Sequence, residues 1–361
     1  MMIPIEVLKK VSVIYTHGHC PDGLASAMIL KDAFRMLGMS PRIEFLVHGT
    51  PEHRAAFPSE DGLTLFCDIA PVKAQSIPMG SAIVLDHHVG AREIVESFGS
   101  LGVYADAEKE PGVSGAVLAF REVWLSTFAE MVNLNENVAD SPQHDRVRDF
   151  ALCVGARDTW QTQDGRFQRG QWISKMLMSK PASHWLGGTR RVELENGAVH
   201  DVPERAVLPY LHESEVEMGR ALFEAHEESV RQAVEQCVSC SVQIGNSPGY
   251  IALFVFQEQA SGFRLCSDVA EALRSNAKTH GGGEVPAVVA GFSYVVDKPG
   301  DNPRLLYSLR GLSGFDVQKF ATANGGGGHK AAAGFSCDGQ VGDPYGLVRV
   351  RLAAFLRGGD T

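Results

Sequence analysis

Short apolar runs and longer stretches of helical periodicity alternate along the first part of the chain. The apolar runs cover residues 12–15, 43–47, 63–67 and 82–85, and after the first of them apolar residues recur at helical spacing over residues 24–37. Short runs of this kind indicate buried strands. Strands separated by helical stretches predict an α/β fold with a doubly wound, mainly parallel sheet.

Polar groups follow three of these predicted strands directly. His17 follows the first strand, Asp68 follows the third, and the fourth is followed by Asp86, His87 and His88. The carboxyl ends of parallel strands meet at one edge of a sheet, which is where open α/β sheets bind their ligands. We therefore expect these side chains to form a site at that edge.

Helical patterns continue to about residue 160. Residues 93–98, 115–124 and 145–156 are predicted helices, and residues 103–104 form a short predicted strand. Ser114 has the character of a helix N-cap. Asp158 follows the third of these helices. The next forty residues lack a clean period, so no element is predicted there.

The second half of the sequence indicates a separate unit. Residues 203–236 read as one long helix that is suited to joining two domains. Strands are predicted at residues 238–244, 250–256, 287–296 and 305–309, with helices at 263–273 and 315–323. The predicted organisation is a catalytic domain at 1–195, a helical linker at 196–236 and a smaller α/β C-terminal domain at 237–361.

Composition narrows the class of protein. A chain of 361 residues, 44% hydrophobic and 21% charged, is long enough for two ordinary globular cores. No apolar run is long enough to cross a bilayer, and we expect a cytoplasmic protein without a membrane partner. The net charge of −10 disfavours a broad surface for long duplexes, but it allows a local pocket for a small or single-stranded phosphate substrate.

The seven cysteines do not form a recognisable framework. They are odd in number and scattered over a long chain, which is not the pattern of a disulfide scaffold. Cys237 and Cys240 form a C-x-x-C pair, but no second pair follows at the spacing of a zinc site. We interpret this pair as two positions of a strand.

The polar residues of the first half have the chemistry of a metal site. Carboxylates and imidazoles at one sheet edge suit Mn²⁺ or Mg²⁺ better than the thiolate sets of structural zinc. Several shared carboxylates indicate two ions, which can together activate water and stabilise an in-line displacement at phosphorus. The candidate residues are His17, Asp22, Asp68, Asp86, His87, His88 and Asp158.

A glycine run near the end of the chain indicates an anion site. Residues 325–328 are four successive glycines, followed by His329 and Lys330. Glycines allow a backbone nest that binds anions through N–H groups. A helix starting within residues 331–334 would aim its positive end at the same anion. Upstream, Ser308 and Arg310 offer a hydroxyl and a guanidinium.

Two distant motifs in this order resemble those of a known family. The first half holds H-x-x-C-P-D-G at residues 17–23, then Asp68, the Asp86-His87-His88 triplet and Asp158, and the second half holds GGGGHKAAAG at residues 325–334. The set resembles the DHH phosphoesterases, in particular the branch that carries the DHH-associated C-terminal domain and includes RecJ-like and NrnA-like enzymes. The resemblance spans both halves of the chain.

The resemblance implies a phosphodiesterase or phosphatase with two Mn²⁺ ions, for which Mg²⁺ or Co²⁺ could substitute. Carried over by position, the metal ligands are His17, Asp22, Asp68, His87 and Asp158, with Asp68 as the bridge between the ions. His88 would contact the scissile phosphate or assist proton transfer, and Asp86 would orient a neighbouring histidine. Substrate phosphate or sugar would be bound by Ser308, Arg310, Gly326, Gly327, His329 and Lys330.

The first motif departs from the family pattern at Cys20, where many relatives carry an aspartate. A thiol is a softer and weaker partner for Mn²⁺ than a carboxylate is. The first ion would therefore be weakly held, differently liganded or replaced by a thiophilic ion. His19 could substitute for the missing carboxylate, although a solvated loop histidine is the plainer interpretation.

We expect a phosphoesterase that acts on short or single-stranded nucleic acid or on small nucleotides, as an oligonucleotide exonuclease does. One rival is a phosphatase for pAp or pyrophosphate. A second is a nucleotide- or nucleic-acid-binding regulatory protein whose metal site has decayed, and a third is a tRNA-binding module like the terminal domain of alanyl-tRNA synthetases. The sequence leaves open the substrate length and polarity, RNA against DNA, and whether the chain forms a homodimer.

Overall fold

The computed structural model describes most of the chain. The described residues are 2–48, 50–55, 62–72, 77–78, 80–134, 142–187, 189–193, 199–203, 213–244, 247–255, 259–279, 286–295, 304–312, 315–338 and 343–357. The chain divides into two compact units, Met1–Phe223 and Glu224–Thr361. Each unit is described by itself.

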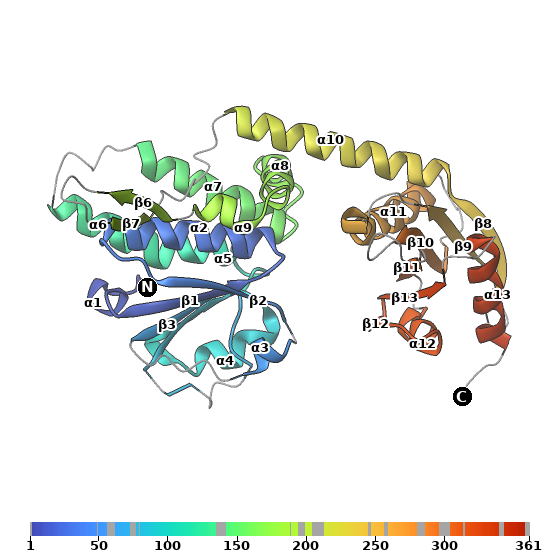
Figure 1. The fold of residues 1–361 in the computed structure, drawn as a ribbon, viewed down its shortest axis with the longest axis horizontal. Coiled ribbons are helices and arrows are strands. Elements are labelled where there is room, and N and C mark those ends of the chain that lie inside the picture. The colour runs from blue at the N-terminus through green and yellow to red at the C-terminus, as the bar shows by residue number, and fades with distance from the viewer. Residues whose placement is uncertain are drawn as a thin grey trace. The chain divides into compact units, whose positions relative to one another are not determined.

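The first unit is built on a five-stranded parallel sheet. Its strands are β1 (Val11–His17), β2 (Arg42–Leu46), β3 (Leu63–Cys67), β4 (Ala82–Asp86) and β5 (Gly102–Tyr104), in the order β2-β1-β3-β4-β5. Every neighbouring pair is parallel. The predicted doubly wound α/β fold is confirmed (Figure 1). The strands that precede the predicted polar residues, β1, β3 and β4, are consecutive in the sheet.

Helices cover both faces of this sheet (Figure 1). The larger core lies against α2 (Pro21–Met36), whose residues 22–30 are all buried. Pro21 occupies the first turn of α2, where a missing N–H costs nothing. The opposite face packs a smaller core that includes Phe66, Val84 and Val95 against α4 (Arg92–Glu96). Burial on both faces explains why β3 and β4 are continuous apolar runs.

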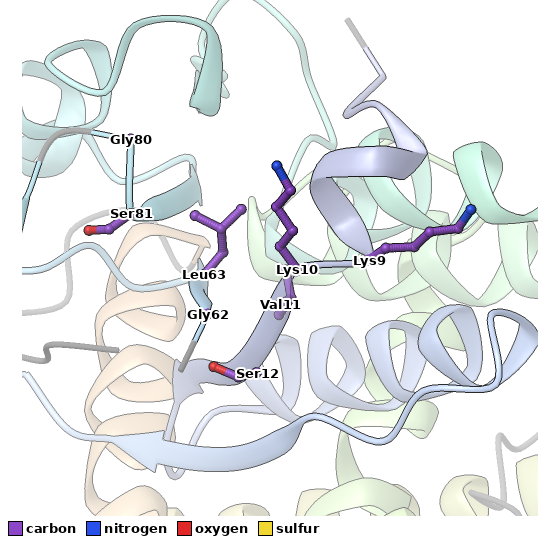
Figure 2. A pocket seen from close by; sticks show the side chains of 8 residues that line it. All are labelled: Lys9, Lys10, Val11, Ser12, Gly62, Leu63, Gly80 and Ser81. Carbon is purple, nitrogen blue, oxygen red and sulfur yellow. The ribbon is translucent and has the colours of Figure 1, made fainter. Parts of the chain in front are cut away.

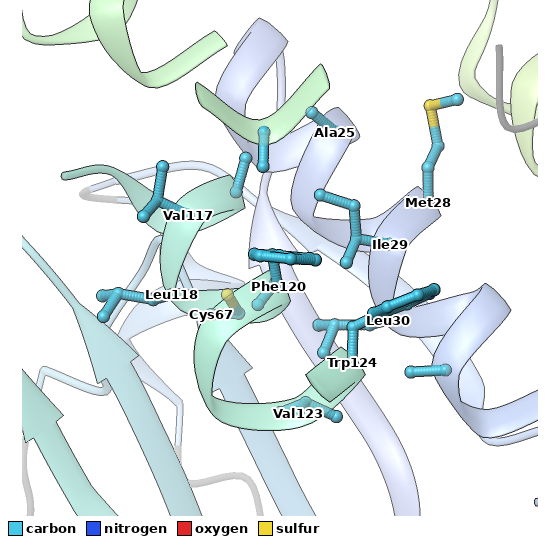
Figure 3. Close-up of a cluster of buried hydrophobic side chains, with 14 of the residues drawn as sticks. Ala25, Met28, Ile29, Leu30, Cys67, Val117, Leu118, Phe120, Val123 and Trp124 are labelled. Atoms are coloured by element: carbon cyan, nitrogen blue, oxygen red, sulfur yellow. The ribbon is translucent and has the colours of Figure 1, made fainter. Parts of the chain in front are cut away.

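The remaining short elements of this part are α1 (Ile5–Leu8), α3 (Pro51–Arg54) and two 3₁₀ turns, Val89–Ala91 and Gly99–Leu101. The predicted helix after Ser114 is longer than expected. It comprises α5 (Gly115–Leu118), a π-helical segment (Ala119–Trp124) and α6 (Leu125–Leu134). Figure 3 shows Phe120 and Trp124 of this segment facing Ile29 and Leu30 of α2. The wider π turn carries two large aromatic rings into the core.

The residues for which the sequence predicted no element contain two helices and a hairpin. After α7 (Pro142–Asp158) come α8 (Phe167–Met178), α9 (Ala182–Leu186) and a hairpin of β6 (Thr189–Glu193) and β7 (Val199–Pro203). Trp185 is 1% exposed, and its indole N–H donates to the Leu177 carbonyl at 2.8 Å. α8 also buries one face at helical spacing, but a glycine and a serine on that face weaken its apolar pattern in the sequence; the buried residues are Gly170, Ile173, Ser174, Met176 and Leu177.

The predicted linker is only partly helical. Helix α10 covers Glu213–Glu235, whereas the sequence predicted a helix from residue 203. β7 occupies residues 199–203, and residues 204–212 lie outside the described part of the chain. The division between the two units falls inside α10. Among the described residues, no helix combines the length and apolar character that a membrane span requires.

The second unit holds a mixed sheet in the order β12-β13-β11-β10-β9-β8. The strands are β8 (Val238–Ile244), β9 (Ser247–Val255), β10 (Val288–Val295), β11 (Arg304–Gly311), β12 (Gly327–His329) and β13 (Ala332–Asp338). Only β9 and β10 pair in parallel among the described ladders. The helices are α11 (Gln259–Thr279), α12 (Val317–Ala323) and α13 (Pro344–Arg357). Tyr307, Phe320 and Phe335 are central to the core.

The predicted helix after the glycine run is wrong, because residues 332–338 form β13. Ala333 and Phe335 are buried, whereas Ser336, the residue after Phe335, is exposed. This period of two is that of a strand. Pairing with β11 on one side and β12 on the other outweighs the helix propensity of the alanines.

The glycine run itself closes α12. The N–H of Gly326 donates to Ala321 and that of Gly325 donates to Thr322, and Gly325 has φ +76°. These are the two hydrogen bonds of a Schellman motif, which needs a left-handed residue after the helix. The two N–H groups are therefore committed to helix carbonyls, and the predicted anion nest does not include them.

Adjacent glycines of this run differ in the space around them. A Cβ on Gly326 would lie 2.1 Å from the Gly334 carbonyl oxygen, whereas one on Gly327 would meet nothing within 4 Å. We predict that Gly326→Ala lowers the free energy of unfolding of the second unit by about 1–3 kcal/mol. Gly327→Ala should change it by no more than about 0.5 kcal/mol. Urea unfolding of the full chain measures both, and equal losses would contradict the packing described.

Candidate metal centre

Three neighbouring strands bring the predicted residues of the first unit together. β1 ends at His17, β3 is followed by Asp68, and β4 ends at Asp86. Because β1 pairs with β3 and β3 with β4, all in parallel, these ends lie side by side at one edge. Parallel register thus converts three separated motifs into one cluster of side chains.

Asp68 lies at the middle of the cluster. Its side chain is 1% exposed, with Oδ1 3.1 Å from His87 Nε2 and Oδ2 3.7 Å from His17 Nδ1. Both Asp68 Oδ2 and His17 Nδ1 are buried without a hydrogen-bond partner. Burial, together with the Asp22 charge, raises the pKa of Asp68 well above its usual range. Two facing unsatisfied atoms of this kind are costly unless a cation lies between them.

The backbone at Asp68 is in the left-handed region, with φ +62°. Its N–H donates to the Leu85 carbonyl at 3.0 Å, which ties the residue to β4 beyond the last paired position of β3. Left-handed backbone is unfavourable for most residues, and aspartate and asparagine tolerate it best. His19 and Trp160 also have positive φ. Each lies two residues after a predicted metal ligand, His17 or Asp158. Strained residues gather around this site.

Asp22 is held by the start of α5. Its Oδ1 accepts hydrogen bonds from the Ser114 hydroxyl at 2.7 Å and the Ala116 N–H at 3.0 Å, and its Oδ2 accepts from the Gly115 N–H at 2.7 Å. Ser114 does occupy the N-cap position, but its side chain makes no capping bond. The carboxylate of Asp22, which belongs to α2, instead accepts the hydrogen bonds of the first N–H groups of α5. Ser114 therefore acts through Asp22, which its N-cap interpretation did not reveal.

Gly115 allows the two acids to approach α5 closely. A Cβ at this position would lie 2.4 Å from the Asp68 Cβ and 2.9 Å from Asp22 Oδ2. Any larger residue would therefore displace at least one carboxylate. The sequence contained the glycine, but nothing in its local pattern indicated this contact.

His87 faces three carboxylates at once. Its Nε2 is 3.1 Å from Asp68, 3.5 Å from Asp158 and 3.7 Å from Asp22. Burial opposes its charged form, but the hydrogen bond that His87 donates to Asp68 and the charge of Asp22 prevail and raise the pKa of His87 to about 9. Burial and the charge of Asp22 raise the pKa of Asp158 to about 6. The charged imidazole of His87 partly neutralises the three carboxylates that surround it.

Asp86 holds His88 from behind. Its Oδ1 accepts hydrogen bonds from the N–H groups of His87 and His88, at 2.7 and 2.9 Å, and lies 2.7 Å from His88 Nδ1. Burial of Asp86 favours a raised pKa, but the bonds from His88 outweigh it and lower the pKa. The same hydrogen bond raises the pKa of His88. The orientation of the half-exposed His88 ring is thus fixed through Nδ1.

The described residues contain four sets whose ligand atoms all lie within 4.8 Å of one another. They are His17, Cys20 and Asp68; Asp68, His87 and His88; Asp22, His87 and Asp158; and His17, His48 and His88. All five predicted metal ligands belong to these sets. Cys20 joins them from the N-cap position of α2. Asp86 does not join any of them.

His48 is a member that the sequence analysis missed. Its ring lies 4.6 Å from that of His17 and 5.5 Å from that of His88. Burial and the neighbouring His17 lower the pKa of His48 to about 4. The signal was available, because His48 follows a predicted strand as the other residues do. β2 pairs with β1, so its end adjoins His17.

The predicted substrate residues of the second unit also share one part of its sheet. Ser308 is buried, and its hydroxyl lies 3.2 Å from Arg310 Nη1, while Arg310 Nε donates to Ser267 at 2.8 Å. In the register of the sheet, Ser308 and Gly327 both pair with Gly334. Arg310 and His329 both pair with Ala332, and Lys330 is exposed in the turn that follows. The second motif is therefore assembled across β11, β13 and β12.

A cavity of about 510 Å³ opens elsewhere on the first unit (Figure 2). It is lined by Lys9, Lys10, Val11, Ser12, Gly62, Leu63, Gly80 and Ser81. These residues lie at the amino ends of β1, β3 and β4, opposite the edge that carries Asp68. None of the predicted site residues lines it. The candidate site is the acid and histidine cluster, not this cavity.

No family model and no curated protein matches the sequence. Among solved structures, the chain is similar to PggH of Vibrio cholerae, described as a pGpG-specific phosphodiesterase. The identity is 14%, the match covers 97% of this chain and 100% of the other, and the TM-score is 0.46. Exonuclease RecJ bound to manganese matches at 17% identity over 98% and 92% of the two chains, with a TM-score of 0.45.

The DHH domain of a member of the s1p family of ribosomal proteins matches at 13% identity over 97% and 88% of the chains, with a TM-score of 0.46. These are distant likenesses, and each description concerns the matched protein only. The strand order and the convergence of the side chains are observed in the structure of this chain itself. The motif residues of the first half thus gather at the carboxyl edge of a parallel sheet, and a second unit with a mixed sheet follows.

Proposed function

We propose that the chain is a metal-dependent phosphoesterase that cleaves phosphodiester or phosphomonoester bonds in short or single-stranded nucleic acids or small nucleotides. The observation that carries this proposal is the facing pair of buried, unsatisfied atoms, His17 Nδ1 and Asp68 Oδ2, 3.7 Å apart amid further acids and histidines. Such an arrangement fits divalent cations. Without a cation this arrangement lowers the stability of the fold, so a purely structural role does not explain it.

The donor set fits the metal chemistry of phosphoryl transfer. Carboxylate oxygens and imidazole nitrogens suit Mn²⁺, with Mg²⁺ and Co²⁺ as substitutes. The proposed ligands are His17, Asp22, Asp68, His87 and Asp158. Asp68 is the proposed bridge, because its two carboxylate oxygens face different ligands, Oδ1 toward His87 and Oδ2 toward His17. When bound, such ions act as Lewis acids and make water a better nucleophile at neutral pH.

The surrounding side chains position and protonate the substrate in this proposal. His88 is held through Nδ1 by Asp86, so its Nε2 donates to a phosphate oxygen or assists proton transfer to the leaving group. Its side chain is 39% exposed, which leaves room for that contact. Ser114 and the α5 backbone fix Asp22, which keeps the ligand set rigid.

In the second unit, Ser308, Arg310, His329 and Lys330 bind substrate phosphate or sugar. Arg310 is oriented by the hydroxyls of Ser267 and Ser308 and by the Leu309 carbonyl, which fixes the position of its positive charge for a phosphate group. The backbone of Gly327 is open to a substrate, because a Cβ there would meet nothing within 4 Å, whereas Gly326 packs against the Gly334 carbonyl and supports the strand beside it. In this proposal the catalytic domain comprises residues 1–195, before the helical linker, and the substrate-binding domain comprises residues 237–361, after it.

Two other functions stay as alternatives. A phosphatase for pAp or pyrophosphate would use the same metal site on a smaller substrate. A nucleotide-binding regulatory protein would keep the second motif and have lost catalysis. The buried unsatisfied atoms favour an enzyme over the regulatory protein, because a decayed site would have no reason to keep their cost.

Substitution of Asp68 tests the proposal directly. Asparagine matches aspartate in size and tolerates the same left-handed backbone, so Asp68→Asn removes the charge and keeps the fold. We expect Mn²⁺-dependent hydrolysis to fall by about 100-fold or more, since several kcal/mol of charge stabilisation are lost. The assay offers a dinucleotide, longer single-stranded DNA and RNA, a cyclic dinucleotide, pAp and pyrophosphate. Unchanged activity in the variant would contradict the metal assignment.

Metal binding should depend on pH in a defined direction. The folded pKa of Asp158 is about 6, above the unfolded value of about 3.9, so the proton it binds stabilises the metal-free fold below pH 4. That contribution is lost as the pH rises through about 6. His87 stays charged over this range, because its folded pKa is about 9. We predict that Mn²⁺ raises the melting temperature more at pH 6.5 than at pH 4.5. An equal increase at both pH values would count against the site.

Arg310 should affect substrate binding rather than turnover. Arg310→Ala removes a charge-assisted phosphate contact, and we expect a rise in KM of roughly 10-fold or more with kcat changed by less than about twofold. Arg304→Ala is the matched control, because Arg304 lies at the start of the same strand. Steady-state kinetics on the best substrate separates the two effects. A fall in kcat without a change in KM would refute the assignment.

A further inference from the structure

We infer that the position formed by His17, Cys20 and Asp68 binds a thiophilic divalent ion of the Zn²⁺ class through the Cys20 thiolate. The two metal positions of the centre would then be chemically unequal. This inference deepens the proposed function and rests on the metal centre assigned there. It concerns which ion one position selects.

The two ligand sets differ in softness. One sulfur, one imidazole nitrogen and one carboxylate oxygen lie within 4.8 Å of one another at His17, Cys20 and Asp68. The set of Asp22, His87 and Asp158 offers only oxygen and nitrogen. Thiolate ligands select Zn²⁺ and similar ions, whereas carboxylates suit Mn²⁺ and Mg²⁺. One centre therefore presents a soft position next to a hard one.

The cysteine does not stand alone at this position. Asp68 is 1% exposed and directs an unpartnered Oδ2 toward His17, whose Nδ1 is buried and also unpartnered. These two atoms are the same ones that indicate a cation in the centre as a whole. The cysteine sulfur would supply the third donor to that pair, which is the number of protein ligands that catalytic zinc sites use.

The backbone fixes Cys20 where it can serve as a ligand. Cys20 is the N-cap residue of α2, with extended backbone at φ −122° and ψ 133°, and Pro21 follows it. Its carbonyl accepts the Leu24 N–H at 3.1 Å, which anchors it to the first helical turn. A ligand held by a helix start on one side and a strand end on the other is rigid, as a metal site requires.

Further imidazoles lie on the same side of the centre. His48 and His88 each have a nitrogen within 4.8 Å of a His17 nitrogen. Imidazole is a borderline donor that suits Zn²⁺ and Co²⁺ well. The carboxylates Asp22 and Asp158 belong to the other set. The surroundings thus strengthen the difference that Cys20 introduces.

Co²⁺ titration of the purified full chain, freed of metal, tests this inference. Co²⁺ bound to a thiolate shows an intense near-ultraviolet charge-transfer band that oxygen and nitrogen ligands do not give. We expect the wild type to develop this band until one ion per chain occupies the thiolate position, with release of the thiol proton. Zn²⁺ should abolish the band at a concentration at least about tenfold below that of Mn²⁺.

Three variants identify the sulfur. Cys20→Ser and Cys20→Asp should each lose the band, and Cys20→Asp should bind Mn²⁺ at least about tenfold more tightly than the wild type, because it restores a carboxylate. Cys237→Ser is the matched control, since it removes a thiol of the second unit, and it should keep the band. Absorbance of the Cd²⁺-loaded wild type and variants reports the same thiolate ligand with a second ion.

Co²⁺ binding by the wild type without the band would overturn the inference, as would a band that persists in Cys20→Ser and disappears in Cys237→Ser. Hydrolysis assays on the same samples keep this result separate from the proposed function. A missing band with active enzyme contradicts the thiolate ligand alone. A band without hydrolysis of any substrate contradicts the phosphoesterase and leaves the thiolate ligand supported.

Discussion

The first unit depends on a buried electrostatic conflict. Asp22, Asp68 and Asp158 all face His87, and the single imidazolium that they can share leaves Asp68 Oδ2 and His17 Nδ1 unsatisfied. Burying like charges without full compensation costs stability, and proteins retain such arrangements chiefly where a cation or a reaction needs them. The raised pKa values of Asp68 and Asp158 express the same cost.

The fold is arranged to hold these charges in place. Parallel pairing of β1, β3 and β4 brings the strand ends together, and the left-handed backbone of Asp68 turns its carboxylate into the cluster. Gly115 lets α5 approach both acids, and the α5 N–H groups satisfy Asp22. The N–H groups at the start of α5 thus bind the carboxylate of Asp22 and at the same time hold this proposed metal ligand in place. Rigidity of this kind is what a phosphoryl-transfer site requires, because its chemistry depends on positioning.

Much of this arrangement could be predicted from the sequence, for physical reasons that differ by region. Continuous apolar runs marked β3 and β4 because both sheet faces are buried, and parallel order then implied that His17, Asp68 and His87 meet. The helix expected after the glycine run failed because strand pairing outweighed alanine propensity. Ser114 and Gly115 were missed as site residues because their roles depend on contacts between distant segments, which no local pattern encodes. The position of His48 directly after a predicted strand was a usable signal that the sequence analysis did not take up.

Anomalous diffraction from crystals grown with Mn²⁺ would test the central claim most directly, namely that the converging strand ends form a divalent-metal centre. The account predicts anomalous density against Asp68, with the oxygens of Asp22 and Asp158 and a nitrogen of His87 within coordination distance. Such density should be absent from crystals of Asp68→Asn. A fully ordered cluster without anomalous density at saturating Mn²⁺, or density only at other residues, would contradict the account.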